Sequence, residues 1–121
     1  MADRRKGLRL VLDVPRIAYA FEVSARPEPK LKDLRTREQK VDRESGLPMW
    51  STEVTVKTEN GAQVITVTTL GQSAPSVSMG DLVEPVDLEA LPWSNTDANG
   101  QIRSGVAFKA TELRALVPAA G

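Results

Sequence analysis

The chain has no cysteine and no histidine among its 121 residues. These absences exclude disulfide bonds, thiol nucleophiles, zinc sites of the usual kind and catalysis by a Ser-His pair. No apolar run approaches the roughly 20 residues of a membrane span, and the start of the chain, MADRRKG, lacks the apolar segment of a signal peptide. A chain of this length forms one domain with a modest core. We therefore expect a soluble, cytoplasmic protein without membrane contact.

An excess of charge of one sign is also missing, because the formal net charge is zero. The charges are nevertheless segregated. Residues 1–43 hold twelve basic and seven acidic side chains, whereas residues 44–121 hold four basic and nine acidic ones. This asymmetry predicts a basic surface for a polyanion, or two complementary surfaces that meet on association, as in a homo-oligomer. A solvated basic arm without any ligand is the simpler alternative.

Residues that could catalyse a reaction lack partners. Asp81, Glu84 and Asp87 stand at strand spacing without a second group that would tune their pKa. The segment Asp97-Ala98-Asn99-Gly100 lacks the further acids and the closing glutamate of a calcium loop, which favours a hairpin turn. Glycine-rich phosphate loops are absent. We expect no enzymatic activity, no metal site and no cofactor.

Alternation of apolar and polar residues predicts short strands through most of the chain. The expected strands are 17–24, 51–57, 63–70, 82–88 and 102–109. Residues 1–13 form a basic arm or a first edge strand in this scheme. Five or six short strands separated by turns predict a mainly β fold, a small barrel over residues 14–121 with little helix.

Several connections carry signals of their own. Asn60-Gly61 predicts a type I′ hairpin turn, because both central residues of that turn need positive φ. Thr111 is placed to cap a short C-terminal helix over 111–117. Residues 30–43 are basic with sparse apolar positions. For them we expect an irregular, mobile connection, with a ragged strand or a short helix as the alternatives.

Aromatic side chains are scarce. Tyr19, Phe21 and Phe108 share the parity of apolar strand neighbours, so we expect them in the core. Trp50 also shares the parity of Val54 and Val56, but it stands at a strand start. Trp93 follows a proline in a short, turn-bounded segment. Either tryptophan can fill the core or offer a stacking surface for a base.

Cations occur opposite the core parity. Lys57 lies on one expected strand, and Arg103 and Lys109 lie on another, with the small residues Gly105 and Ala107 between them. This spacing lets a sugar-phosphate backbone approach the sheet while the cations bind phosphates. Ordinary solvated strand polarity is the alternative. To complete a groove, the basic connection would have to close over the strands, and its cations are Arg35, Arg37, Lys40 and Arg43.

The order of features in residues 77–116 resembles the second half of the oligonucleotide-binding (OB) fold of single-stranded-DNA-binding proteins. Gly80-Asp81 opens an apolar strand, Trp93 follows, the Asp97–Gly100 turn comes next, and a last strand begins near Ile102. The resemblance implies an OB-like barrel that binds single strands. The chain departs from the common pattern at residues 71–79, which leave room for at most one turn of the helix that usually follows the third strand.

A second resemblance covers about fifteen residues. The segment Asp42-Arg43-Glu44-Ser45-Gly46-Leu47-Pro48-Met49-Trp50, followed by Glu53-Val54-Thr55-Val56, is similar to a signature of small actinobacterial proteins of the Pra type. Those proteins are encoded on plasmids and integrative conjugative elements and are labelled regulatory proteins or replication activators. The resemblance implies a non-enzymatic role in the replication of a mobile element.

Two hypotheses of different class follow. In the first, the protein is an accessory factor that binds single-stranded DNA during replication or transfer, through Trp50, Trp93, Lys57, Arg103, Lys109 and the basic connection. In the second, an OB-like interaction module recruits a replication or transfer protein, such as an initiator or relaxase, without touching DNA. A duplex-binding regulator is disfavoured because no helix is long enough to read a major groove.

Overall fold

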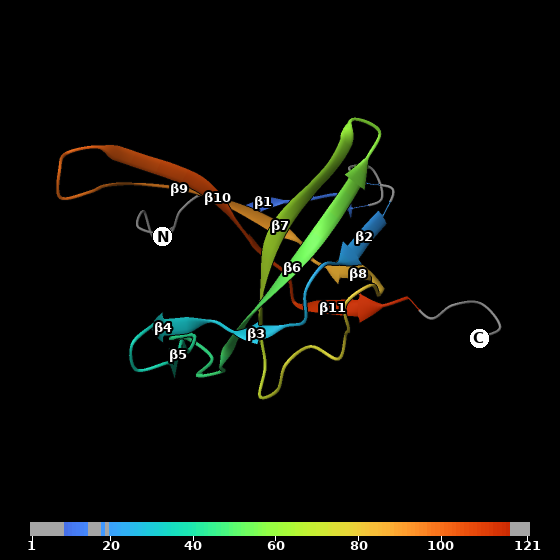
Figure 1. Cartoon of the computed structure of the whole chain (residues 1–121), viewed down its shortest axis with the longest axis horizontal. Helices are drawn as coiled ribbons and strands as arrows, with labels where there is room; N and C mark the ends of the chain where they lie inside the picture. Colours follow the sequence, from blue (N-terminus) through green and yellow to red (C-terminus); the bar gives the residue numbers. More distant parts are fainter. Residues whose placement is uncertain (1–8, 15–17, 19, 117–121) are drawn as a thin grey trace.

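The computed structural model describes residues 9–14, 18 and 20–116, and this part of the chain is mainly β, as predicted. It contains eleven strands in place of the expected five or six. They are β1 (Leu10–Val11), β2 (Ala20–Val23), β3 (Glu28–Pro29), β4 (Leu31–Asp33), β5 (Glu38–Gln39), β6 (Met49–Thr58), β7 (Gly61–Leu70), β8 (Leu82–Val86), β9 (Glu89–Thr96), β10 (Ile102–Lys109) and β11 (Glu112–Ala115). The main sheet runs β1-β9-β10-β7-β6-β2-β8-β11 (Figure 1).

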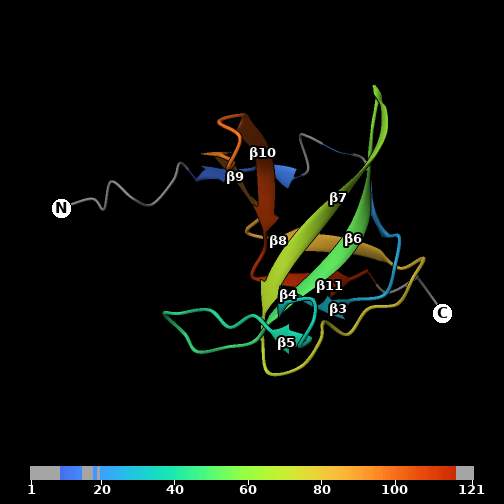
Figure 2. The same cartoon turned by 60° about the vertical axis from the view of Figure 1, so that its left-hand side comes forward.

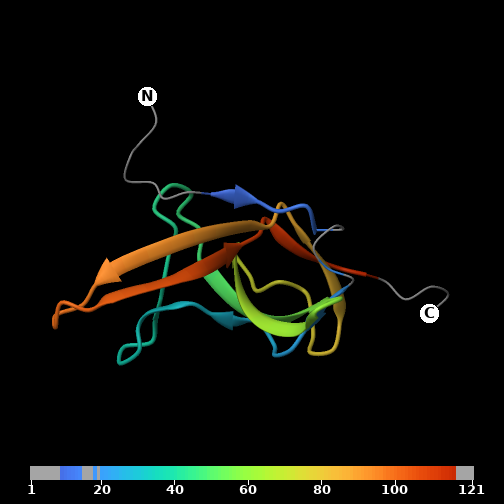
Figure 3. The same cartoon turned by 90° about the horizontal axis from the view of Figure 1, so that it is seen from above.

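The larger strand count arises partly because two long stretches are each broken in the middle. The expected strand 82–88 ends at Val86, and Asp87 takes a left-handed backbone with φ of 52° before β9 begins. Ala110 and Thr111 separate β10 from β11 without a left-handed residue. After the breaks, β9 and β10 pair with each other, while β8 and β11 form the next antiparallel pair. The sheet curls at these points, so the β6–β7 and β9–β10 pairs lie on different sides of the molecule (Figure 3).

The core lies inside this curl. Val23, Val54, Val67, Val83 and Leu88 are almost completely buried. Phe21 is buried with them, as predicted, and Phe108 is partly buried against the same cluster. Tyr19 lies outside the described residues. Valine dominates because β-branched side chains fit the inner face of a strongly bent sheet.

The long β6–β7 hairpin turns where the sequence predicted, but by a different turn. Thr58 pairs with Gly61, so the two loop residues are Glu59 and Asn60. Gly61 has φ of 124°, whereas Asn60 has no positive φ, which rules out the expected type I′ geometry. The Thr58 hydroxyl accepts a hydrogen bond from the Asn60 N–H and donates one to the Gly61 carbonyl. These bonds stabilise the turn without a left-handed asparagine.

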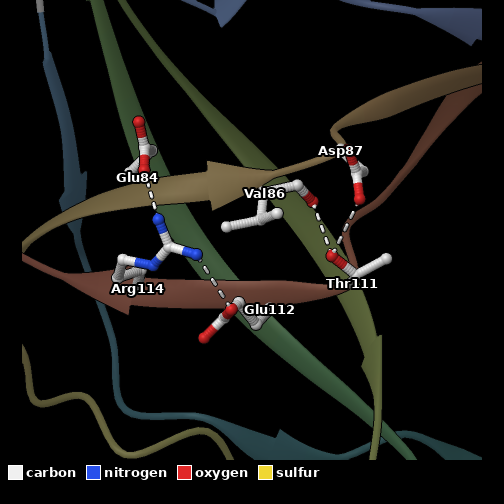
Figure 4. Close-up of polar contacts among 6 residues, drawn as sticks. All are labelled: Glu84, Val86, Asp87, Thr111, Glu112 and Arg114. Carbon is white, nitrogen blue, oxygen red and sulfur yellow. Dashed lines mark hydrogen bonds and ion pairs between the residues drawn. The ribbon is translucent and has the colours of Figure 1, made fainter.

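The predicted C-terminal helix is wrong, because residues 112–115 form β11. The hydroxyl of Thr111, expected to cap a helix, donates instead to the Val86 carbonyl, with Asp87 Oδ2 at 3.4 Å. Arg114 reaches Glu84 on β8 and Glu112 on its own strand, at 3.2 and 3.3 Å (Figure 4). Leu113 is buried whereas Glu112 and Arg114 on either side of it are exposed, so one side chain of β11 faces the core. Pairing with β8 therefore overrides the weak helical signal; Val117, the last residue of the predicted helix, lies outside the described residues.

The basic connection is more regular than expected. Residues 28–29 pair with β6, and β4 and β5 form a separate two-stranded sheet. The Lys40 N–H donates to the Lys30 carbonyl at 2.7 Å, and the Met49 N–H donates to the Lys40 carbonyl at 2.9 Å. The ragged-strand alternative is thus nearest to the structure. Residues 71–81 contain turns and bends and no helix, as expected.

Candidate nucleic-acid interface

The β9–β10 hairpin projects from the body of the protein (Figures 1 and 3). Its strands pair along their whole length, from Glu89 opposite Lys109 to Thr96 opposite Ile102. Residues directly opposite each other in an antiparallel pair share a face. One face, which we call the Trp93 face, consists of Glu89, Leu91, Trp93, Asn95, Arg103, Gly105, Ala107 and Lys109. The predicted sequence of cation, small residues and cation along β10 therefore lies on the same face as Trp93.

Trp93 lies over Gly105. A Cβ atom added to Gly105 would stand 2.8 Å from Cζ2 of the indole and 3.2 Å from its Nε1, so any side chain there would displace the ring. Gly105 has no positive φ, and its small size rather than its backbone freedom is what the site uses. The segment around Trp93 is part of a strand, not the turn-bounded segment predicted. The Trp93 side chain remains 46% exposed, which leaves indole surface available to a ligand.

The tip of the hairpin is a hydrogen-bonded turn. The Asp97 carboxylate accepts hydrogen bonds from the N–H groups of Asn99 and Gln101, and Gly100 has φ of 80°. The predicted hairpin turn is confirmed. Asp97 also lies 3.4 Å from the Arg103 guanidinium. The pair orients Arg103 beside the Trp93 face and, because the arginine side chain is largely exposed, adds little stability.

The base of the Trp93 face leads into an open depression of about 810 Å³. Four cationic side chains line it against two acidic ones. The lining includes Arg9, Lys40, Arg43 and Lys109, with Asp42 and Glu44. Lys40 and Arg43 of the basic connection thus lie with Lys109 of the hairpin in one depression. A depression with this balance of charges attracts anions.

One acid of the depression is held in a turn. The backbone N–H and the hydroxyl of Ser45 both donate to Asp42 Oδ2, and these bonds, with the nearby Lys109, keep the pKa of Asp42 below its usual range. Gly46 closes the turn with φ of 74°, and Val41 forms a bridge with Pro48. The Asp42–Trp50 signature therefore encodes a compact turn that positions Arg43 and Lys40 at the depression.

A further cation lies beside this site. The Lys30 ammonium donates to Thr68 Oγ1 at 3.2 Å, and Thr68 pairs with Lys109 across β7 and β10. Burial lowers the pKa of Lys30, and repulsion from Lys40 lowers it further. A bound anion near Lys30 and Lys40 would relieve the repulsion between these two lysines.

Other predicted site residues lie elsewhere. Lys57 forms an ion pair with Glu22 at 2.8 Å. It follows Met49, which lines the depression, by eight residues of β6, and so lies roughly 27 Å away along the strand. Arg35 and Arg37 are exposed at the β4–β5 turn, outside the depression lining. Trp50 is half-buried, and its Nε1–H donates to the Gly71 carbonyl at 2.9 Å. Its role in the described structure is to fix the 71–78 loop.

Sequence reasoning missed Arg9 and Lys30. Arg9 precedes the two-residue strand β1, whose pairing with β9 brings it toward Lys109. No sequence signal shows which strand a short edge strand will pair with. Lys30 lies in the segment predicted to be irregular, although the polar–apolar–polar order of Lys30, Leu31 and Lys32 is compatible with a strand.

The chain matches no protein-family model and no functionally characterised protein. No helix within residues 9–14, 18 and 20–116 is long and apolar enough to cross a membrane. The functional assignment therefore rests on the residues themselves.

Proposed function

We propose that the protein is a non-catalytic single-stranded-DNA-binding accessory factor with an OB-like barrel, acting in the replication or transfer of a mobile element. The observation that carries the proposal is the continuity of the Trp93 face with the basic depression. A half-exposed indole, a cation at each end of β10 and a cluster of cations at the base follow each other on one surface.

The strand order supports the OB-like part of the proposal. If β8–β9 and β10–β11 are each taken as one bent strand, and β1–β2 as another, five long strands remain. Their neighbours follow the OB order, with the third and fifth strands parallel through Val67–Phe108 and Thr68–Lys109. The first of these strands pairs with the fourth at both ends, through β1–β9 and β2–β8.

The surface suits a single strand because each part has a chemical counterpart in it. A base stacks on Trp93, and the phosphates on either side pair with Arg103 and with Lys109. Lys109 follows Arg103 by six positions, which is roughly 20 Å along the strand and accommodates several nucleotides. Farther along, Lys40, Arg43 and Arg9 receive the continuing backbone, and Arg35 and Arg37 are available to a longer strand.

A titration of the Trp50→Phe variant with an oligothymidine tests the proposal. The chain has two tryptophans, so in this variant all indole fluorescence comes from Trp93. We expect quenching at low salt that reverses as salt rises. Absence of binding at low salt would refute the proposal and favour recruitment of a replication or transfer protein, for which the exposed apolar residues of the hairpin are the supporting observation.

A further inference from the structure

Two lysines face each other at the end of the β4–β5 sheet opposite its turn. Leu31 pairs with Gln39 in that sheet, so continuing the register by one residue places Lys30 opposite Lys40. The hydrogen bond from the Lys40 N–H to the Lys30 carbonyl, at 2.7 Å, belongs to this arrangement. β4 and β5 lie at the end of the β6–β7 hairpin that is remote from its turn (Figure 2). Opposed residues of an antiparallel pair share a face, so two ammonium groups extend from one face here.

This pair of like charges has no acidic partner in the part of the chain that the structure describes. Neither Lys30 nor Lys40 forms an ion pair with a carboxylate of residues 9–14, 18 and 20–116. Lys30 is partly buried, and its ammonium donates to the hydroxyl of Thr68, a neutral group in a residue that is 7% exposed. Like charges directly opposite each other destabilise a sheet, and buried charges are ordinarily paired. The two lysines therefore offer an anion a place in which it offsets an existing repulsion.

We propose that Lys30 and Lys40 form a subsite for a phosphate monoester, namely the terminal phosphate of a strand that ends in the basic depression. Lys40 lines the depression together with Arg43 and Lys109, so the subsite opens onto the surface proposed for the single strand. The ammonium of Lys30, held by Thr68, has two further N–H groups that can donate to phosphate oxygens. The strand as ligand rests on the proposed function, whereas the phosphate subsite rests on the two lysines.

The charge of a terminal phosphate suits this pair better than that of an internal one. A phosphate monoester carries about 1.5 to 2 negative charges at pH 7 and three acceptor oxygens. An internal phosphate of the backbone carries a single negative charge, as does a carboxylate. Two cations without an acidic partner are thus neutralised by one monoester, whereas one diester or one carboxylate leaves part of their repulsion.

Oligothymidines of one length that carry a 5′-phosphate, a 3′-phosphate or neither test the subsite with a strand. We expect the chain to bind one of the two phosphorylated strands about tenfold more tightly than the unphosphorylated one, the order of one added charge-assisted contact. In Lys30→Met and in Lys40→Gln this ratio should fall toward one. Lys32→Met is the matched control, since Lys32 is an exposed lysine of the same sheet outside the depression lining, and should keep the wild-type ratio.

Inorganic phosphate tests the subsite without a strand. At about pH 8, where phosphate is mainly a dianion, and at constant ionic strength, replacing chloride by phosphate should raise the melting temperature of the wild type and of Lys32→Met. Lys30→Met should not respond. Equal affinity for strands with and without a terminal phosphate, a ratio unchanged in Lys30→Met, or equal stabilisation of wild type and Lys30→Met by phosphate would each overturn the proposal. If phosphate stabilises the wild type selectively while no strand binds, the subsite stands with a free phosphate monoester as its ligand, and the proposed function fails.

Discussion

At the scale of single residues, the structure gives the two tryptophans different surroundings: Trp93 is half-exposed, and Trp50 is half-buried and hydrogen-bonded. The ring of Trp93 lies over Gly105 and is partly exposed, whereas the indole N–H of Trp50 donates a hydrogen bond to the Gly71 carbonyl. The sequence allows either tryptophan to fill the core or to stack on a base. The alternation of apolar and polar residues does not decide between these roles, because it is a weak guide at a strand start and beside a proline. The neighbouring residues that decide the matter, Gly105 and Gly71, are distant in the chain from the tryptophans that they contact.

Trp93→Ala should weaken single-strand binding by about 1–3 kcal/mol, the usual contribution of one stacked base. Gly105→Ala should weaken binding as well, since its methyl group displaces the indole. Ser104→Ala, on the opposite face of the same strand, is the control and should bind normally. Fluorescence titration and thermal melting of each variant would measure binding and stability together. If Trp93→Ala melts early but binds normally once folded, stacking on Trp93 is excluded.

Trp50→Ala should instead reduce stability, by about 3 kcal/mol, at the lower end of values for Trp→Ala because the side chain is half-buried. Trp50→Phe preserves the packing and loses the hydrogen bond to Gly71, so about 1 kcal/mol is expected. Urea denaturation measures both. Equal stability of Trp50→Ala and wild type would contradict this role.

At the scale of elements, the strands with clear alternation could be predicted, and the ones decided by pairing could not. The expected strand 102–109 matches β10, and 51–57 and 63–70 lie within β6 and β7. Residues 111–117 predict a helix because Thr111 resembles a cap, but the hydrogen bond from Thr111 to Val86 reaches a partner strand that the local sequence does not identify. The projection of the hairpin beyond the core could not be predicted either, because Ile102, Val106 and Phe108 share one parity although only Phe108 packs against the core.

The basic connection packs on β7 through Lys30. We expect removal of the Lys30 charge to raise the stability of the fold and to lower its affinity for a single strand. Its folded-state pKa is lowered by burial and by Lys40. The charged form is therefore disfavoured in the folded protein, and this cost is fully present below the folded pKa and disappears as pH rises past the unfolded value of 10.5. Lys30→Met should raise the melting temperature at pH 7, and the gain should shrink toward alkaline pH.

The same substitution removes a cation beside the depression, so single-strand affinity should fall. Melting curves between pH 7 and pH 11, with Lys32→Met as a control on the exposed side chain two residues away, test the stability effect. A Lys30→Met variant that melts below wild type at pH 7 would show that the bond to Thr68 outweighs the cost of burial.

At the scale of the whole molecule, zero net charge conceals a local concentration of cations. Folding brings Arg9, Lys40, Arg43 and Lys109 together from three separate parts of the chain. The segregation of charge along the sequence predicts a basic surface. Which cations form that surface depends on the pairing of β1 with β9 and of β7 with β10.

Binding should therefore depend steeply on salt although the protein is neutral overall. Each phosphate neutralised on a single strand contributes about −0.7 to the slope of log affinity against log salt. The proposed surface has five cations, which together predict a slope of about −3.5; they are Arg9, Lys40, Arg43, Arg103 and Lys109. Arg103→Ala and Lys109→Ala should each make the slope shallower by about 0.7. Lys57→Ala, remote and paired with Glu22, should leave it unchanged. Binding that is indifferent to salt would point to recruitment of a protein instead.

The narrow attachment of the hairpin has a consequence for motion. Among the described residues, β10 pairs with β7 at Phe108 and Lys109, and β1 pairs with β9 at Ala90 and Glu89. Beyond these pairs no other described strand flanks the hairpin, so its outward-facing amide groups have no strand partner within residues 9–14, 18 and 20–116. In hydrogen exchange, residues 102–106 should lose protection long before residues 52–56 of β6, which lie between two strands. The outer part of the Trp93 face would then open and close on a time scale independent of the unfolding of the domain.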